Sequence, residues 1–297
     1  MRYRPLGTAG AAVSAITLVL DASVAAQGAE GVRELVFAAL EQGVNSFHID
    51  SLDRTLIRTT GEALSHVERE LLHVGLTVGP MPSGKRDFSL EGIDDVLTSV
   101  LKHSNLEYFD AVIFDDPDKN ELPANVMKAI RADTRIRKLG VRGDSDVMDI
   151  YIASSLFDVL HTPCHIQIDS KQRGRLREAR AADMIIFGSE YYPPNLFALP
   201  EVVAVEPVKS GFFSMKKKPL PPIEKPSPFE FLRRTPGWEA EDLCLAHALL
   251  DPSLGSVLAR VTSIEHLERL AAACERDMPV SLPAQLEMAR VSNVSAT

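Results

Sequence analysis

Cysteine is scarce in this chain, and long apolar runs are absent from it. Three cysteines, Cys164, Cys244 and Cys274, occur among 297 residues. A small, odd number in a chain of this length argues against a disulfide framework and favours a reducing compartment. No run reaches the roughly 18 apolar residues that a transmembrane helix needs, so we expect no membrane span and predict a cytoplasmic protein.

Positive charge is also in the minority. There are 32 Lys and Arg against 41 Asp and Glu, which gives a net charge of −9. Such a chain offers no broad basic face to neutralise phosphates, so we expect neither nucleic acid nor an anionic membrane as a partner. No phosphate-binding loop and no G-x-G-x-x-G motif is present. A small-molecule ligand is the remaining partner class, and the oligomeric state is left open.

The first 30 residues have the outline of a signal peptide, with two arginines, an apolar stretch over 11–20 and small residues over 22–29. The apolar stretch ends at Asp21 after only ten residues, and Pro5, Gly7 and Gly10 interrupt the segment before it. These features disfavour secretion.

The chain does have a regular alternation of strand-like and helical patterns. Residues 1–20 read as a β-hairpin, and amphipathic helical segments separate the later strands. The strand-like segments after the hairpin are 44–50, 71–79, 110–115, 137–143, 157–161, 184–188, 202–208 and 256–259. Repeated strand–helix units favour a parallel sheet, and over about 300 residues a closed barrel. We therefore predict an α/β protein, a (β/α)8 TIM barrel with an N-terminal hairpin, as a single domain over 1–297.

Three local details accompany this prediction. One strand candidate is surplus, and either 184–188 or 202–208 is an insertion. Residues 216–237, with three consecutive lysines and six prolines, are predicted to form a loop. A helix over 263–276 is expected to open with a capping box, Thr262-x-x-Glu265.

Six segments in the same order resemble the aldo/keto reductase family. They are MRYRPLGTAGAAVSAITL, ALEQGVNSFHIDS, LEYFDAVIFDDPD, IRKLGVRGDS, EPVKSGFF and SVLARVTSIEHLERL. The resemblance covers nearly the whole chain and implies a TIM barrel that binds NADPH and reduces carbonyls.

The catalytic positions that the resemblance implies have all changed. The family uses a tyrosine as proton donor, together with an aspartate, a lysine and a histidine. The aspartate position falls on His48 and the tyrosine position on Asp53. The lysine position falls on Thr77 and the histidine position on Asp115. A shift of two residues preserves strand parity and would place Asp50 at the aspartate position.

The loss of the tyrosine and lysine is the decisive change. No tyrosine follows the strand at 44–50 closely, and no lysine precedes Lys85. A free phenol is a poor acid at pH 7 and needs a neighbouring cation to become useful. Standard carbonyl reduction is therefore not expected of this chain.

The cofactor positions implied by the resemblance are weakened. Ser210 and Gly211 retain the small pair of the pyrophosphate loop, and Arg260 lies where members often hold the 2′-phosphate. The carboxamide positions have become Arg142, Gly143 and His161. NADPH remains a possible but weakened cofactor.

Histidines and carboxylates gather at the expected strand ends. They are His48, Asp50, Asp53, Asp115, Asp116 and His161. Imidazoles and carboxylates are also common ligands of divalent metals, although acids at strand ends commonly cap helices. We predict no metal site and favour a degenerate reductase-like barrel with a ligand-binding, scaffold or regulatory role. The alternatives are an NADP-dependent oxidoreductase with another acid, such as His48, and a metal-dependent barrel enzyme.

Overall fold

The computed structural model describes residues 1–7, 12–81, 83–197 and 227–294. A two-stranded antiparallel sheet, β1 with β2, comes first, and eight further strands close into a parallel barrel in the order β10-β3-β4-β5-β6-β7-β8-β9. The strands are β1 (Tyr3–Pro5), β2 (Ala12–Ser14), β3 (Ile16–Leu20), β4 (Ser46–Ile49), β5 (His73–Val78), β6 (Ala111–Asp115), β7 (Leu139–Arg142), β8 (Val159–Pro163), β9 (Ile185–Ser189) and β10 (Leu254–Ala259). The predicted (β/α)8 barrel with an N-terminal hairpin is confirmed.

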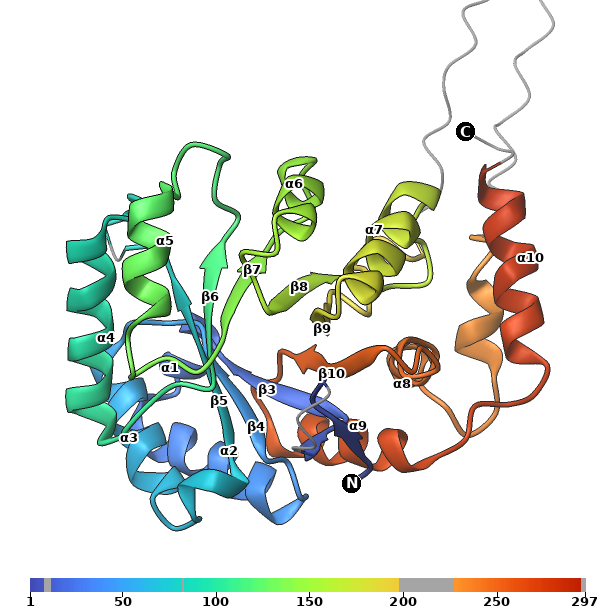
Figure 1. The fold of residues 1–297 in the computed structure, drawn as a ribbon. Coiled ribbons are helices and arrows are strands. Elements are labelled where there is room, and N and C mark those ends of the chain that lie inside the picture. The colour runs from blue at the N-terminus through green and yellow to red at the C-terminus, as the bar shows by residue number, and fades with distance from the viewer. Residues whose placement is uncertain (8–11, 82, 198–226, 295–297) are drawn as a thin grey trace, which may run out of the picture.

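Helices follow the barrel strands and surround them, as Figure 1 shows. The α-helices are α1 (Ala22–Ala25), α2 (Gly28–Glu41), α3 (Arg54–Leu64), α4 (Leu90–Ser104), α5 (Ala124–Arg131), α6 (Val147–Ala153), α7 (Ser170–Ala181), α8 (Ala240–Ala248), α9 (Ile264–Glu275) and α10 (Leu282–Val294). Two short 3-10 helices are η2 (Arg69–Leu71) and η3 (Glu230–Arg234).

The barrel strands are buried on both faces, which explains their nearly continuous apolar sequences. Phe47, Ile49 and Phe114 are fully buried in the core that joins strands and helices. Inside the barrel the packing is partly polar. The Thr17 hydroxyl lies 2.8 Å from that of Ser46 and 2.7 Å from that of Ser256, which links β4, β3 and β10. These hydroxyls satisfy one another in a region that water does not reach.

The surplus strand is resolved by the barrel order. β9 (Ile185–Ser189) pairs with β8 and β10, so the segment 184–188 supplies the barrel strand. The other candidate, 202–208, lies outside the described residues. The segment 1–20, predicted as one hairpin, divides at Ala15. The hairpin strand β2 ends at Ser14, and the first barrel strand, β3, begins at Ile16.

Two local predictions need correction. The helix α9 is capped by Ser263, whose side chain accepts a hydrogen bond from the backbone N–H of His266, one residue later than the expected Thr262 cap. Part of the predicted loop 216–237 is helical, because η3 occupies Glu230–Arg234. Residues 216–226 of that loop lie outside the described residues.

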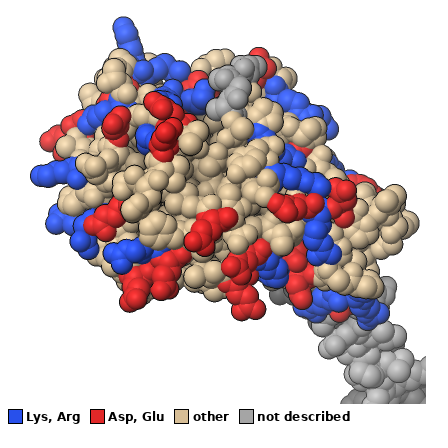
Figure 2. Space-filling view, turned by 90° about the horizontal axis from the view of Figure 1, so that it is seen from below, with Lys and Arg blue, Asp and Glu red and all other residues tan. Residues whose placement is uncertain are grey.

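The face shown in Figure 2 carries charges of both signs. Blue Lys and Arg side chains are interspersed with red Asp and Glu side chains around a central area of other residues. Among the described residues, no helix combines the length and apolar character needed to cross a membrane. The cytoplasmic location stays a prediction.

Candidate functional site

The carboxylate of Asp50 stands at the centre of the polar groups at the barrel mouth. Asp50 follows β4 directly, so its side chain lies at the carboxyl ends of the strands, where barrel enzymes place their sites. One oxygen accepts hydrogen bonds from Thr77 at 2.7 Å and Arg142 at 2.8 Å, and the other accepts one from Arg260 at 2.8 Å. All the partners come from other strands or their ends, so Asp50 holds β4, β5, β7 and the end of β10 together.

The two arginines extend this arrangement in both directions. Arg142 donates from Nε to Asp115 at 2.6 Å, and Arg260 donates to Asp21 at 2.7 Å. The result is an alternating series, Asp21–Arg260–Asp50–Arg142–Asp115, which we call the rim network. It contains three carboxylates and two guanidinium groups, and each guanidinium contacts two carboxylates.

The rim network fixes the charge of Asp50. Burial would raise the pKa of its carboxyl group, but the neighbouring His48 and Arg142 and the hydrogen bonds from Thr77 and Arg260 outweigh burial and hold the pKa below its usual range. Asp50 is therefore ionised at neutral pH. A carboxylate in this state cannot donate a proton to a substrate.

His48 lies inside the barrel beneath the rim network. It is 2% exposed, and its Nε2 lies 2.8 Å from the Thr77 hydroxyl. Burial lowers the pKa of His48 to about 3, so the imidazole is neutral at pH 7. A cationic imidazolium is the form that acts as a general acid, and His48 does not adopt it at this pH.

Asp53, on which the tyrosine position of the resemblance falls, is an exposed helix cap. Its side chain accepts a hydrogen bond of 2.8 Å from the backbone N–H of Leu56 and opens α3. Among the described residues, no hydrogen bond or ion pair joins Asp53 to Thr77, Asp50 or Asp115. The structure thus brings Asp50, Thr77, His48 and Asp115 together and leaves Asp53 outside the group.

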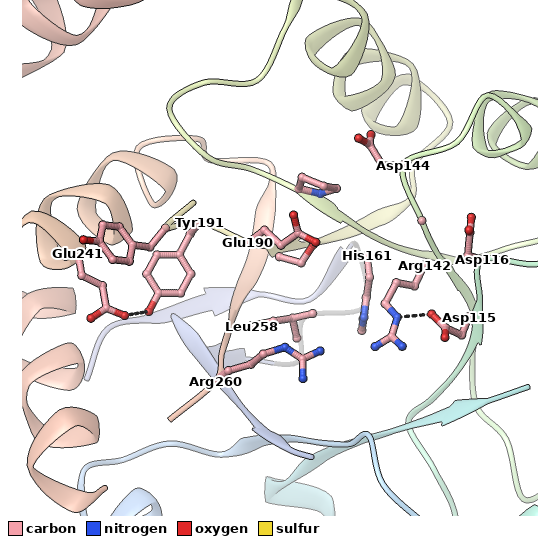
Figure 3. Close-up of a pocket in the computed structure, with 14 residues that line it drawn as sticks. Asp115, Asp116, Arg142, Asp144, His161, Glu190, Tyr191, Glu241, Leu258 and Arg260 are labelled. Carbon is pink, nitrogen blue, oxygen red and sulfur yellow. Dashed lines mark hydrogen bonds and ion pairs between the residues drawn. The ribbon is translucent and has the colours of Figure 1, made fainter. Parts of the chain in front are cut away.

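A cavity of about 460 Å³ opens beside the rim network, and we call it the acidic cavity. Its lining holds five carboxylates and only two guanidinium groups, those of Arg142 and Arg260 (Figure 3). The lining residues are Asp115, Asp116, Arg142, Gly143, Asp144, His161, Pro163, Ser189, Glu190, Tyr191, Tyr192, Glu241, Leu258 and Arg260. A second hollow, of about 800 Å³, lies across Asp115 and Arg142 and includes Asp50, Asp53 and Thr77.

The part of the acidic cavity that follows β9 was not predicted from the sequence. Glu190, Tyr191 and Tyr192 come directly after this strand, and Glu241 lies in α8. The signal was present, because polar residues directly after a barrel strand lie at the mouth. Uncertainty over which of two segments formed the strand concealed it.

The two tyrosines of the cavity are poor proton donors. Tyr191 donates a hydrogen bond of 2.7 Å from its hydroxyl to Glu241, and burial together with this carboxylate raises its pKa well above the ordinary value. Burial raises the pKa of Tyr192 as well, aided by Cys244 and Glu241. A catalytic phenol needs the opposite shift, which a nearby cation provides.

The thiol of Cys164, three residues after His161, is also unreactive. Cys164 is buried, and burial raises its pKa to about 12, so it carries no nucleophilic thiolate at neutral pH. Its sulfur packs against the backbone at Gly188, where an added Cβ would lie 2.2 Å from Sγ. Cys164 fills space between β8 and β9.

Structural comparison identifies the architecture of the chain. An aldo-keto reductase from Bacillus halodurans, AKR11C1 in its holo form, superposes with a TM-score of 0.74 at 17% identity, covering 97% of this chain and 96% of the other. An aldo/keto reductase from Klebsiella pneumoniae in complex with NADP and acetate gives a TM-score of 0.71 at 15% identity, covering 97% and 95%. This chain has the aldo-keto reductase fold. No family model and no curated protein sequence matches it.

The described residues of this aldo-keto reductase fold do not fit NADPH well. Arg260, the expected 2′-phosphate ligand, is engaged with Asp21 and Asp50. The lining of the adjoining cavity is predominantly acidic, which opposes an anionic dinucleotide. Ser210 and Gly211, the other two expected cofactor residues, lie outside the described residues, so their role stays a prediction.

The described residues do not form a metal-binding site either. Among the described residues, no group of three or more His, Cys, Asp and Glu side chains is arranged to hold a metal ion. The imidazoles of His48 and His161 are neighbours, with ring centroids 5.0 Å apart in an edge-to-face contact, but they form only a pair. The second, metal-dependent alternative therefore gains no support from this part of the chain.

Proposed function

We propose that this chain is a ligand-binding barrel with the aldo-keto reductase fold that does not catalyse standard NADPH-dependent carbonyl reduction. The observation that carries the proposal is the environment of Asp50. Its carboxylate binds Thr77, Arg142 and Arg260, and among the described residues no tyrosine or lysine contacts it. The described residues around Asp50 therefore supply no proton donor with a suitable pKa, which supports the proposal.

The alternative of an unusual proton donor is less well supported. His48 is neutral at pH 7 because burial lowers its pKa to about 3. Tyr191 has its pKa raised by burial and Glu241. Neither group has the tuning that general acid catalysis requires.

The experiment is a cofactor titration combined with an activity assay. We would follow nicotinamide fluorescence while titrating NADPH, and follow NADPH consumption with 4-nitrobenzaldehyde as the carbonyl probe. We expect no saturable NADPH signal and no consumption above a protein-free control.

Two variants would show whether any NADPH binding depends on Arg260. Arg260→Leu removes the expected phosphate ligand, and Arg177→Leu removes an exposed arginine of α7 as a matched control. If NADPH binds to the wild type and to Arg177→Leu but at least tenfold more weakly to Arg260→Leu, and the aldehyde is reduced, the chain is an NADP-dependent oxidoreductase and the proposal is wrong.

A further inference from the structure

We propose that the acidic cavity binds a small organic cation, an ammonium group on an aromatic or aliphatic body, with Glu190, Asp116 and His161 as its hydrogen-bond acceptors. This inference rests on the proposed ligand-binding function and adds the chemical class of the ligand.

Glu190 and Asp116 differ from the other carboxylates of the acidic cavity because they have no cationic partner among the described residues. Asp115 pairs with Arg142, Asp144 with Arg175, and Glu241 with Arg269. Within the part of the chain that the structure describes, Glu190 forms no ion pair, and the Asp116 side chain accepts one hydrogen bond, of 3.3 Å, from the hydroxyl of Ser145.

Both unpaired acids are held in an unusual backbone conformation. Each follows a barrel strand directly, β9 or β6, and each has a positive φ, 50° for Glu190 and 44° for Asp116. Non-glycine residues in this region cost about 1 kcal/mol or more. The mouth thus places two acidic side chains on the cavity wall at an energetic cost.

The floor of the acidic cavity provides an independent observation. His161 is 2% exposed and lines the cavity, and its Nδ1 has no hydrogen-bond partner. Figure 3 shows its ring projecting from β8 into the space between Arg142 and Arg260. Buried polar groups are nearly always paired, so an imidazole that lines a cavity and has no hydrogen-bond partner among the described residues points to a missing ligand.

The protonation state of His161 indicates which kind of ligand group it can bind. Burial, with His48 and Arg142 adding to it, lowers the pKa of His161 well below its ordinary value, and the ring is neutral at pH 7. A neutral imidazole presents one acceptor nitrogen, and carboxylates are acceptors only. The two unpaired carboxylates and the acceptor nitrogen of His161 can therefore each take an N–H donor, and an ammonium group has three.

An anion is the competing ligand, because Arg142 and Arg260 also face the cavity. Each guanidinium already donates to two carboxylates of the rim network, at 2.6–2.8 Å. With three carboxylates for two guanidinium groups, the rim network carries no positive excess. An anion would have to compete with these ion pairs, whereas a cation meets unpaired acceptors.

The size and walls of the acidic cavity suit such a ligand. Its volume of about 460 Å³ falls within the range of small-molecule sites. Tyr191 and Tyr192 contribute aromatic rings to the lining, and cations bind favourably to aromatic faces.

The test compares three probes of similar size and different charge: benzylammonium, benzyl alcohol and benzoate. Binding to the full chain is measured by isothermal titration calorimetry, with competition by ligand-observed NMR for weak probes. We expect benzylammonium to bind at least tenfold more tightly than the other two. If benzoate binds as tightly as benzylammonium, or if none of the three binds, the inference is wrong.

Variants locate the binding. Glu190→Gln, an exposed position that is not expected to disturb folding, should weaken benzylammonium binding about three- to tenfold, and His161→Phe should weaken it as well. The matched control is Glu107→Gln, which removes an exposed charge before β6 at the opposite end of the barrel. Equal affinities for Glu190→Gln and Glu107→Gln would overturn the assignment.

The two proposals fail in different ways. Reduction of 4-nitrobenzaldehyde with NADPH would contradict the proposed function, whatever the three probes do. Loss of the preference for benzylammonium, with no carbonyl reduction, would contradict the ligand class alone.

Discussion

The rim network and the acidic cavity are adjacent, but their polar groups are used in opposite ways. In the rim network every carboxylate has a guanidinium partner within 2.6–2.8 Å. In the acidic cavity Glu190 has no ion pair with a described residue and His161 has an orphan nitrogen. Groups that satisfy one another stabilise the fold, and groups without partners remain available to a ligand.

This difference also separates a buried charge from an exposed one. The Asp50 side chain is 9% exposed and depends on its arginines, since an unpaired charge at this depth is strongly destabilising. Glu190 is exposed and is solvated by water when no ligand is present. The contrast predicts large stability effects in the rim network and small ones at the cavity wall.

Acid should produce the largest effect, because both regions border buried imidazoles. Burial lowers the pKa of His48 to about 3 and that of His73 to about 4, and it lowers that of His161 well below the ordinary value. The unfolded chain takes up protons on these histidines below about pH 6.5, while the folded chain does not. The contribution of each is therefore complete above pH 6.5 and declines as the pH falls.

Linkage gives the size of this acid effect. At pH 5 each histidine lowers the free energy of unfolding by about 2 kcal/mol relative to neutral pH. Urea unfolding at pH 7 and pH 5 measures the difference, and His161→Phe should reduce it by about 2 kcal/mol, the contribution of one such histidine. A difference that is the same in wild type and variant would mean that His161 is protonated in the folded chain.

Arg142→Met should have the next largest effect. It leaves Asp50 and Asp115 without the guanidinium that pairs with both, so we expect the free energy of unfolding to fall by about 3 kcal/mol at pH 7. The control, Arg177→Met on the surface of α7, should change it by less than about 0.5 kcal/mol. A loss below about 1 kcal/mol for Arg142→Met would show that the rim network does not stabilise the barrel.

Asp53→Ala should have an intermediate effect. This substitution removes the side chain that caps α3 at Leu56, and loss of such a cap costs about 1 kcal/mol. Thermal unfolding by circular dichroism provides the measurement, and Asp53→Ser, which keeps a capping oxygen, should recover most of the loss. Equal stabilities for the two variants would contradict the capping role.

Glu190→Gln should have the smallest effect on stability. No ion pair with a described residue is lost, so the free energy of unfolding should stay within about 0.5 kcal/mol of the wild type. Urea unfolding without added ligand tests this. A loss above about 1 kcal/mol would make Glu190 part of the supporting structure and would erase the distinction between the two regions.

Much of the fold could be predicted from the sequence, but the rim network could not. Strand and helix patterns are local, so β4, β5 and β6 were recognisable from short segments. The partners of Asp50 are far away along the chain, with Arg142 at a separation of 92 residues and Arg260 at 210. Patterns within a short window contain no information on such pairs.

His48 in β4 and Asp50 directly after it were the two candidates for the aspartate position of the family, and they differ by a shift of two residues. His48 and Asp50 point to the same side of their strand, so the parity of the sequence does not distinguish them. Their depth in the barrel distinguishes the two residues, because His48 is buried below Thr77 and Asp50 reaches the rim network. Depth depends on where the strand ends, and sequence patterns locate strand ends poorly.

The hydroxyl contacts of Thr17 have a consequence for synthesis on the ribosome. Thr17 joins Ser256 of β10, and the pairing of β10 with β3 closes the barrel. Arg260 reaches Asp50 from the same end of the chain. Until β10 leaves the ribosome, the nascent polypeptide holds seven barrel strands with two unpaired edges, and such edges are where a partly folded sheet pairs with other chains.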